Sequence, residues 1–220
     1  MREKPSRYSV RDLQARCAAF GFDPGPIDNL WGVRTQQAVR AAMEARGVYS
    51  ADALFHPSGL HRVIMHWTAG AYPVLKDELA HYHILIDKDG RAWPGLLKPE
   101  SNADVSDGSY VAHTRALNTG SIGVAVDAMA GANEVPFDAG SAPITEAQVD
   151  ALAREVADLC MTYDIPVSKW TVLSHAEVQP TLGVWQRGKW DIAWIPGMDR
   201  PGDPVTVGDE LRRRILEEVR

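Results

Sequence analysis

The chain has 220 residues, 45% of them hydrophobic and 24% charged, a composition typical of a globular protein with one medium-sized core and a small appendage. The formal net charge of −6 offers no basic surface, which argues against nucleic acid and against anionic membranes as partners. No apolar run follows the positively charged start, and none is long enough to span a bilayer, so we expect cytoplasmic synthesis without a signal peptide.

Two short helices are predicted near the start of the chain. The first begins after Ser9, which is a good N-cap, and ends at Gly21. Turn-forming residues fill the stretch 22–32. The second helix is expected to run from a Thr35 cap to Gly47. Two helices around a tight turn are small enough that their own core would be marginal.

A segment with proline and glycine, residues 50–60, separates these helices from the rest of the sequence and is predicted to be a linker. We therefore expect two domains, a helical one at 1–55 and a larger one at 56–220.

The two cysteines, Cys17 and Cys160, lie far apart, each within an apolar pattern of helical spacing. Neither belongs to a Cys-x-x-Cys pair. We expect two buried thiols rather than a disulfide.

The second domain contains apolar runs of strand length and longer segments with apolar residues at helical spacing. Thr145 and Gln148 match a capping box at the start of one such helix. Because strands and helices are mixed rather than strictly alternating, the expected fold class is α/β, with a mixed central β-sheet flanked by helices. The expected strands are 62–65, 82–86, one beginning at Arg91, 122–126 and one opening at Trp170; the expected helices are 76–81, 145–163 and 207–219.

Four residues with metal or catalytic chemistry follow two of these strands. His66 and His175 each come at the end of an apolar strand, and Lys189 and Asp191 lie in the loop that follows the second one. Two imidazoles and a carboxylate are typical ligands of a catalytic Zn²⁺, which leaves a fourth position for water. Each residue alone is more often structural than catalytic. Their combination predicts a zinc hydrolase.

Four motifs carry a family resemblance. In chain order they are His66-Trp67-Thr68-Ala69, a Tyr-His strand leading from Tyr82 to Asp89-Gly90, the stretch Asn118 to Gly123, and the closing His175…Lys189-Trp190-Asp191. From about residue 62 to about 194 the chain resembles the zinc-dependent N-acetylmuramoyl-L-alanine amidases, a family shared by phage lysozymes, bacterial amidases and peptidoglycan recognition proteins. The resemblance implies zinc ligation by His66, His175 and Asp191.

The resemblance also assigns catalytic roles. Lys189 matches the family's catalytic lysine, which would stabilise the oxyanion of the tetrahedral intermediate. Tyr82 stands where phage lysozymes and many recognition proteins have an active-site tyrosine that positions water or donates to the oxyanion. The cytosolic amidases use a glutamate at the position of Ala125 instead. Asp127 follows two residues later on the same side of the expected strand, which makes it a minor catalytic candidate.

Substrate contacts are expected from residues near the same motifs. His113 falls where the family often has a histidine lining the substrate groove. We add Asn118 and Trp67 as candidates, although tryptophans belong at least as often to the core. His81 and His83 flank Tyr82 and are expected to point away from its face of the strand.

The first segment resembles the peptidoglycan-binding repeat found beside many cell-wall hydrolases. The resemblance gives wall-binding roles to Asp28 and Trp31, and Asn29 replaces a usual glycine in a turn that asparagine tolerates. The alternative is that these residues only pack a helical hairpin. The matching residues are Leu13, Gln14, Gly21, Gly25, Ile27, Asp28, Trp31, Gly32, Thr35, Ala38 and Val39.

The function expected from these patterns is hydrolysis of the amide bond between N-acetylmuramic acid and L-alanine in peptidoglycan, by a monomeric enzyme. A wall-binding segment and no export signal suggest a phage or prophage endolysin, released through a separate holin-type membrane-permeabilising protein. The alternatives are a cytosolic amidase that recycles peptidoglycan fragments and a recognition protein without catalytic activity.

Overall fold

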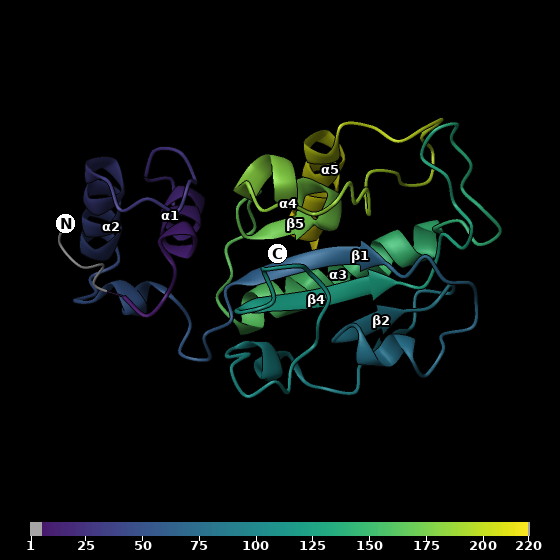
Figure 1. Cartoon of the computed structure of the whole chain (residues 1–220), viewed down its shortest axis with the longest axis horizontal. Helices are drawn as coiled ribbons and strands as arrows, with labels where there is room; N and C mark the ends of the chain where they lie inside the picture. Colours follow the sequence, from purple (N-terminus) through teal and green to yellow (C-terminus); the bar gives the residue numbers. More distant parts are fainter. Residues whose placement is uncertain (1–5, 220) are drawn as a thin grey trace.

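The computed structural model describes residues 6–219, which form a five-stranded sheet with helices on both faces and a pair of helices at the N-terminal end (Figure 1). The strand order is β3-β2-β4-β1-β5; β2, β4, β1 and β5 run parallel, and β3 is antiparallel to β2. This is the mixed α/β sheet that the sequence predicts. The strands are β1 (Arg62–Trp67), β2 (Ile84–Ile86), β3 (Ala92–Pro94), β4 (Ser121–Val126) and β5 (Val172–Ser174). The helices are α1 (Val10–Ala19), α2 (Val33–Ala45), α3 (Glu146–Thr162), α4 (His175–Leu182) and α5 (Pro204–Glu218), with 3-10 turns η1 (Ala51–Leu54), η2 (Glu78–Ala80) and η3 (Pro99–Asn102).

Strand β1 organises the sheet because it is buried along its whole length and pairs with both β4 and β5. Successive side chains of a strand alternate between the two faces. Val63 and Met65 belong to the main hydrophobic core on one face. Arg62, Ile64 and His66 therefore project from the opposite face. This alternation puts a charged residue, an apolar residue and a candidate metal ligand in one row.

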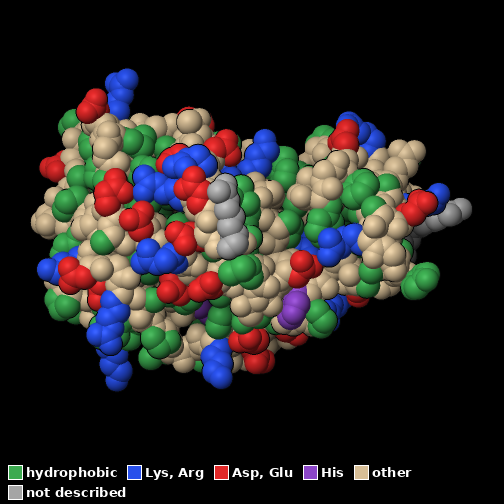
Figure 2. Space-filling model, turned by 180° about the vertical axis from the view of Figure 1, so that it is seen from behind, with side chains coloured by type: hydrophobic (Ala, Val, Ile, Leu, Met, Phe, Trp, Pro, Cys, Tyr) green, Lys and Arg blue, Asp and Glu red, His purple; other side chains and the backbone are tan. Residues whose placement is uncertain are grey.

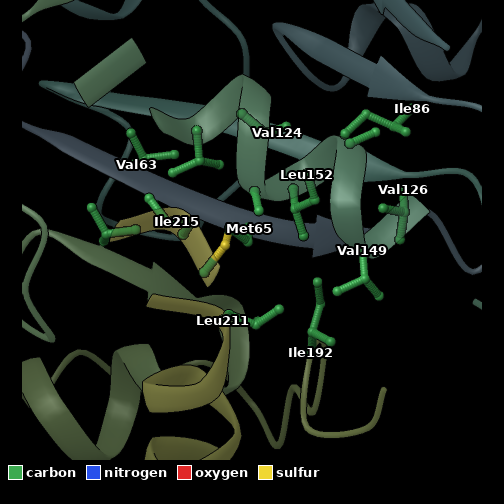
Figure 3. Packing of buried hydrophobic residues seen from close by; sticks show 14 of the residues in the cluster. Val63, Met65, Ile86, Val124, Val126, Val149, Leu152, Ile192, Leu211 and Ile215 are labelled. Carbon is green, nitrogen blue, oxygen red and sulfur yellow. The ribbon is translucent and has the colours of Figure 1, made fainter. Parts of the chain in front are cut away.

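Helices α3 and α5 cover the core face of the sheet. Figure 3 shows Val149 and Leu152 of α3 and Leu211 and Ile215 of α5 directed toward the side chains of β1 and β4. The predicted capping box at Thr145 is present, with the threonine side chain accepting from the Gln148 backbone amide. Each fully buried aliphatic side chain contributes about 1.5–3 kcal/mol, so this face supplies most of the hydrophobic stabilisation of the larger domain.

The N-terminal helices have a core of their own, built on Leu13 and Cys17 of α1 and on apolar residues of α2 and η1. Ser9 caps α1, as predicted, by accepting from the Asp12 amide. The predicted Thr35 cap is wrong: the N-cap of α2 is Gly32, three residues earlier, and the Thr35 hydroxyl donates instead to the Pro24 carbonyl. The Thr35 hydroxyl therefore links α2 to the preceding turn instead of capping the helix.

The two cysteines are free and buried, as the sequence predicts. Burial raises the pKa of each thiol to about 12, so both stay protonated and unreactive at neutral pH.

The N-terminal helices dock onto the sheet face opposite α3. Ala15 of α1 joins Ile64, Leu173 and Val178 in a second apolar cluster. Polar contacts surround this cluster: Arg62 donates to Asp12, Arg11 to the Leu182 carbonyl, and Arg16 to Asp164 at 3.2 Å. The predicted linker is packed, since η1 lies within it and the Phe55 ring stacks on Tyr8 with centroids 3.8 Å apart. The division at residue 55 remains a prediction.

Other predicted elements also differ from those observed. The strand expected from Tyr82 begins only at Ile84, and the helix expected at 76–81 is reduced to the single turn η2. The strand pattern was wrong at Tyr82 because residues 81–83 form a turn against the end of β3, where the Gly95 amide donates to the His83 carbonyl. The expected surface loop at 97–109 includes η3 and the buried Asn102, whose amide bonds the Val111 carbonyl.

The surface carries acidic and basic side chains in mixture. Figure 2 shows Lys and Arg interspersed with Asp and Glu over the back of the molecule, without an extended patch of one sign. None of the helices in the described residues 6–219 is both long enough and apolar enough to cross a membrane.

Candidate metal centre and active site

Three side chains far apart in the sequence converge at the carboxyl ends of β1 and β5. The Nδ1 atoms of His66 and His175 lie 3.0 and 3.1 Å from the same oxygen, Oδ2 of Asp191. All three residues are buried, and their candidate ligand atoms lie within 4.8 Å of one another. His66 is near the end of β1, and β5 leads directly to His175. Because β1 and β5 are parallel neighbours, their ends bring the two imidazoles together.

The sequence suggested that His175 ends a strand. In the structure it is instead the first residue of helix α4. The predicted loop after it is helical until Gly183, whose positive φ of 66° ends α4 and lets the chain return to Asp191. Glu177, fully buried in the first turn, accepts from the Ser174 amide at 2.8 Å and pairs with Arg212 of α5 at 2.8 Å. This pair fixes the start of α4 and hence the position of His175.

The hydrogen bonds of His66 determine which of its nitrogens carries the proton. His113 Nε2 lies 3.3 Å from the Ser121 carbonyl oxygen, which can only accept, so His113 carries its proton there and presents a bare Nδ1. His66 Nε2 lies 3.1 Å from that Nδ1 and must therefore be the donor. Burial lowers the pKa of His66 to about 4, so the ring is neutral and its Nδ1 lone pair faces Asp191.

His175 is oriented in the same way by Gln186. The amide nitrogen of Gln186 donates to the carbonyls of Arg115 and Val184 at 3.0 and 3.3 Å, which leaves its oxygen as the acceptor. His175 Nε2 donates to that oxygen at 3.0 Å. With Nε2 holding the proton, the Nδ1 of a neutral His175 also faces Asp191.

Two imidazole lone pairs and a carboxylate oxygen therefore point at one another, an arrangement that requires positive charge between them. Burial lowers the pKa of His175, but the carboxylate of Asp191 outweighs burial and raises it. Burial likewise raises the pKa of Asp191, and the two histidines outweigh it and lower the value to about 2. Two imidazole nitrogens and one carboxylate oxygen are suitable ligands for a zinc ion. The other nitrogen of each imidazole is held by a hydrogen-bond partner, as is usual for histidines that bind zinc.

A cavity of about 410 Å³ opens over these three residues. Tyr82 lies on its wall, half-buried, with its ring centroid 5.3 Å from that of His66. Burial raises the pKa of Tyr82, so its phenol stays protonated at neutral pH. Lys189 also lines the cavity and is exposed to solvent. Both predicted catalytic residues thus face the same space as the three candidate ligands.

The predicted substrate contacts lie in three different settings. His113 is buried and reaches the cavity beside His66. Asn118 also lines the cavity, and its side-chain oxygen accepts from the backbone amides of His113 and Thr114, which orders this loop. Trp67 adjoins the cavity but has its ring in the main core, edge-on to Trp190 with centroids 4.5 Å apart.

The minor catalytic candidate, Asp127, does not line the cavity. Ala125 pairs with His66 across β1 and β4, and Asp127 lies beyond the end of that pairing, bonded to Thr68 at 3.1 Å. His83 is buried and its Nδ1 accepts from the Gly123 amide, in agreement with a structural role.

The family model for N-acetylmuramoyl-L-alanine amidases matches residues 57–198. The chain belongs to this amidase family. All three predicted zinc ligands lie within the matched residues. The match confirms the enzyme class that the motifs predicted. No curated protein matches the sequence.

Three solved structures are similar to this chain at low sequence identity. The amidase LysC from Clostridium intestinale URNW is 16% identical, with a TM-score of 0.44, and the match covers 72% of this chain and 86% of that one. AmiD from E. coli, solved with anhydro-N-acetylmuramic acid-L-Ala-D-gamma-Glu-L-Lys, is 23% identical, with a TM-score of 0.41 over 55% of this chain and 49% of that one. Drosophila peptidoglycan recognition protein SD is 18% identical, with a TM-score of 0.41 over 67% and 85%.

Several residues around the amidase cavity were missed by sequence reasoning. Gln186 orients His175 from within the closing motif, and Thr114 lies with its hydroxyl 2.9 Å from His113 Nδ1. Arg115 and Arg187 line the cavity and lie 4.9 and 5.7 Å from the ring of Trp185, which is 58% exposed. The only sequence signal for them was their nearness to His113 and Asp191.

The residues predicted to bind the wall lie in the N-terminal helical pair. The Asp28 carboxylate accepts from the Gln14 side chain and from the Leu30 amide, both at 2.9 Å, which orders the turn before α2. Asp28 and the exposed Leu30 border a groove of about 290 Å³. Trp31 is half-buried against the core of the helical pair and does not line this groove.

Proposed function

We propose that this chain is a zinc-dependent peptidoglycan hydrolase that cleaves the amide bond between N-acetylmuramic acid and the L-alanine of the stem peptide. The observation that carries the proposal is the convergence of the Nδ1 atoms of His66 and His175 on one oxygen of Asp191, at the base of an open cavity. Membership of the amidase family supports the choice of reaction.

His66, His175 and Asp191 would hold the zinc ion. When bound, zinc supplies Lewis acidity, which polarises the scissile carbonyl and lowers the pKa of a water molecule to about 7. His113 and Gln186 hold the Nε2 protons of the two histidines and so keep both Nδ1 atoms available. These contacts preorganise the ligands, so that little rearrangement is needed during the reaction.

Lys189 and Tyr82 act on the reacting amide. The Lys189 ammonium lies at the cavity and stabilises the negative charge that develops on the carbonyl oxygen. Tyr82 keeps its proton because burial raises the pKa of its phenol, so it serves as a hydrogen-bond donor rather than as a base. With Ala125 in the strand position facing His66, the chain has no carboxylate there to act as a general base.

The rim of the cavity suits an anionic glycopeptide. Arg115 and Arg187 line the cavity and can pair with the carboxylates of a stem peptide. Trp185, which lies within cation-π distance of both arginines, presents an exposed ring, and such a ring can stack on a sugar. The two arginines give the cavity a positive edge, and Trp185 lies next to them.

The proposed biological role is wall lysis of the endolysin type, with release from the cytoplasm by a separate holin-type protein. The N-terminal helices would hold the enzyme on the sacculus and raise its local concentration there. The groove beside Asp28 and Leu30 supports this assignment. A recycling amidase would act on soluble fragments and would not need such a groove.

The test uses purified sacculi and the full chain. Zinc-loaded protein should release stem peptides, and a chelator should stop the release, with zinc restoring it. Release that persists without metal would contradict the mechanism, and no release by fully loaded protein would indicate a recognition protein. For the wall-binding role, the Asp191→Ala variant should sediment with sacculi without degrading them, and Asp28→Ala combined with Leu30→Ala should reduce sedimentation. No sedimentation of Asp191→Ala with sacculi would favour recycling, and unchanged sedimentation of the double variant would remove this groove from wall binding.

A further inference from the structure

Asp127 has a buried charge that the amidase mechanism does not use. Its side chain is fully buried at the end of β4. Oδ1 accepts from the Thr68 hydroxyl at 3.1 Å, whereas Oδ2 is buried without a hydrogen-bond partner in the described part of the chain. Burying a charged carboxylate oxygen without a hydrogen-bond partner costs free energy. Buried carboxylates therefore usually pair with a cation or coordinate a metal.

The neighbours of Asp127 add negative charge. Burial, together with the charges of Glu78 and Asp87, raises the pKa of Asp127 to about 6. Asp87 is already satisfied by the Asp89 and Arg91 amides and the Trp93 indole. Glu78 uses Oε2 to accept from the Leu75 amide at 2.7 Å. The other oxygen of Glu78, Oε1, lies beside Gly70, which Asp127 also adjoins.

Gly70 shows how closely these oxygens gather. A Cβ at this position would lie 2.2 Å from Glu78 Oε1, 2.9 Å from Thr68 Oγ1 and 3.3 Å from Asp127 Oδ1. Three oxygens, two of them from carboxylates, therefore surround one small space that only a glycine leaves open. Like charges this close repel each other unless a cation or a proton lies between them.

We propose that Asp127, Glu78 and Thr68 form a second cation site, for a hard divalent ion of the calcium class. Calcium takes carboxylate and neutral oxygen ligands in irregular geometry and completes its shell with backbone carbonyls and water. Zinc is disfavoured here because the site offers no imidazole or thiolate. The site is separate from the ligand set at Asp191.

The position of the site gives the cation a structural effect on the cavity. Thr68 lies just beyond His66 and lines the cavity, and Glu78 belongs to η2, which leads to Tyr82. A cation held between Glu78 and Asp127 ties this segment to the end of β4. Binding should therefore stabilise the wall that carries Tyr82.

The test is isothermal titration of zinc-loaded full chain with calcium chloride. We expect one saturable site per chain and a rise in the melting temperature on binding. Asp127→Asn and Glu78→Gln should each weaken binding by about tenfold or more, since each removes a charged ligand. Asp104→Asn changes an exposed aspartate outside the site and should bind like the parent. Gly70→Ala keeps every charge but places a methyl among the oxygens, and it should also block binding.

Two further measurements keep the proposal open to refutation. Asp191→Ala lacks a candidate zinc ligand and should still bind calcium, which separates this site from the catalytic one. The proposal is wrong if millimolar calcium gives no saturable binding, or if Asp127→Asn and Asp104→Asn bind calcium equally. It is also wrong if Asp127→Asn stabilises the protein and calcium has no effect on the parent, because the two carboxyl groups would then share a proton.

Discussion

Arg62 and His66 project from the same face of β1, one toward the N-terminal helices and the other toward the candidate metal centre. Arg62 donates to Asp12 of α1, and His66 meets Asp191. Ile64 lies between them and packs in the cluster that includes Ala15 of α1. The docking of the helical pair and the position of one metal ligand therefore depend on a single face of one strand.

Removing the Asp12 carboxylate should destabilise the protein. Arg62 is 1% exposed at its side chain and Asp12 16%, so Asp12→Asn leaves a buried guanidinium without its counter-charge. We expect a loss of about 3 kcal/mol in the free energy of unfolding, measured by urea denaturation. Asp23→Asn is the matched control, since its pair with Arg34 is largely exposed and should contribute little to stability. Equal losses in the two variants would contradict the buried pair.

The same aspartate predicts a pH dependence of stability. Burial raises the pKa of Asp12, but His61 and Arg62 outweigh burial and lower the value below its ordinary 3.8. A depressed pKa in the folded state means that the contribution is fully present above about pH 4 and is lost as pH falls further. The difference in unfolding free energy between parent and Asp12→Asn should therefore be constant from pH 7 to 5 and shrink below pH 4. A difference that stays constant to pH 3 would contradict this assignment.

Asp191→Ala should abolish both zinc binding and hydrolysis. It removes the oxygen on which both histidines converge, and two imidazoles alone do not complete a catalytic zinc site. Zinc content by atomic absorption and peptide release from sacculi are the measurements, with circular dichroism to verify folding. Asp199→Ala, at an exposed position, should retain both properties. Full activity in Asp191→Ala would remove this residue from the mechanism.

Gln186→Ala should weaken zinc binding while leaving the candidate ligands in place. His175 loses the acceptor for its Nε2 proton, and loss of such an outer contact typically costs about 10- to 100-fold in metal affinity or activity. Competition with a zinc-binding dye measures the affinity. Gln186→Glu keeps an acceptor oxygen and should recover much of it. If Ala and Glu variants bind zinc equally, Gln186 acts only through packing.

Lys189→Ala should lower kcat by about 100- to 1000-fold, the usual effect of removing one oxyanion donor. Zinc content should not change, because Lys189 is exposed at the cavity and is not among the candidate ligands. Lys98→Ala, another exposed lysine, is the control and should keep the parent's kcat. A fall in zinc content that parallels the fall in rate would show that Lys189 supports the metal rather than the reaction.

Local patterns predicted much of the framework. The capping residues of α1 and α3 and the course of β4 follow from side chains within a few residues of one another, and the structure has them as predicted. Strand boundaries around Tyr82 were less predictable, because the turn at 81–83 is held by Gly95 and Gly123, which lie in other elements.

The sequence by itself determined the fold class through apolar periodicity. The resemblance of its motifs to a known family gave the amidase assignment and the candidate residues His66, His175, Lys189 and Asp191, because both signals lie in neighbouring residues. Only the tertiary structure decided which nitrogen of each histidine faces Asp191, since that depends on His113 and Gln186 across the cavity. It also decided that the N-terminal helices are docked through Asp12 and that Asp127 faces Glu78 instead of the cavity. Such contacts join residues distant in the chain, and packing, rather than local preference, brings them together.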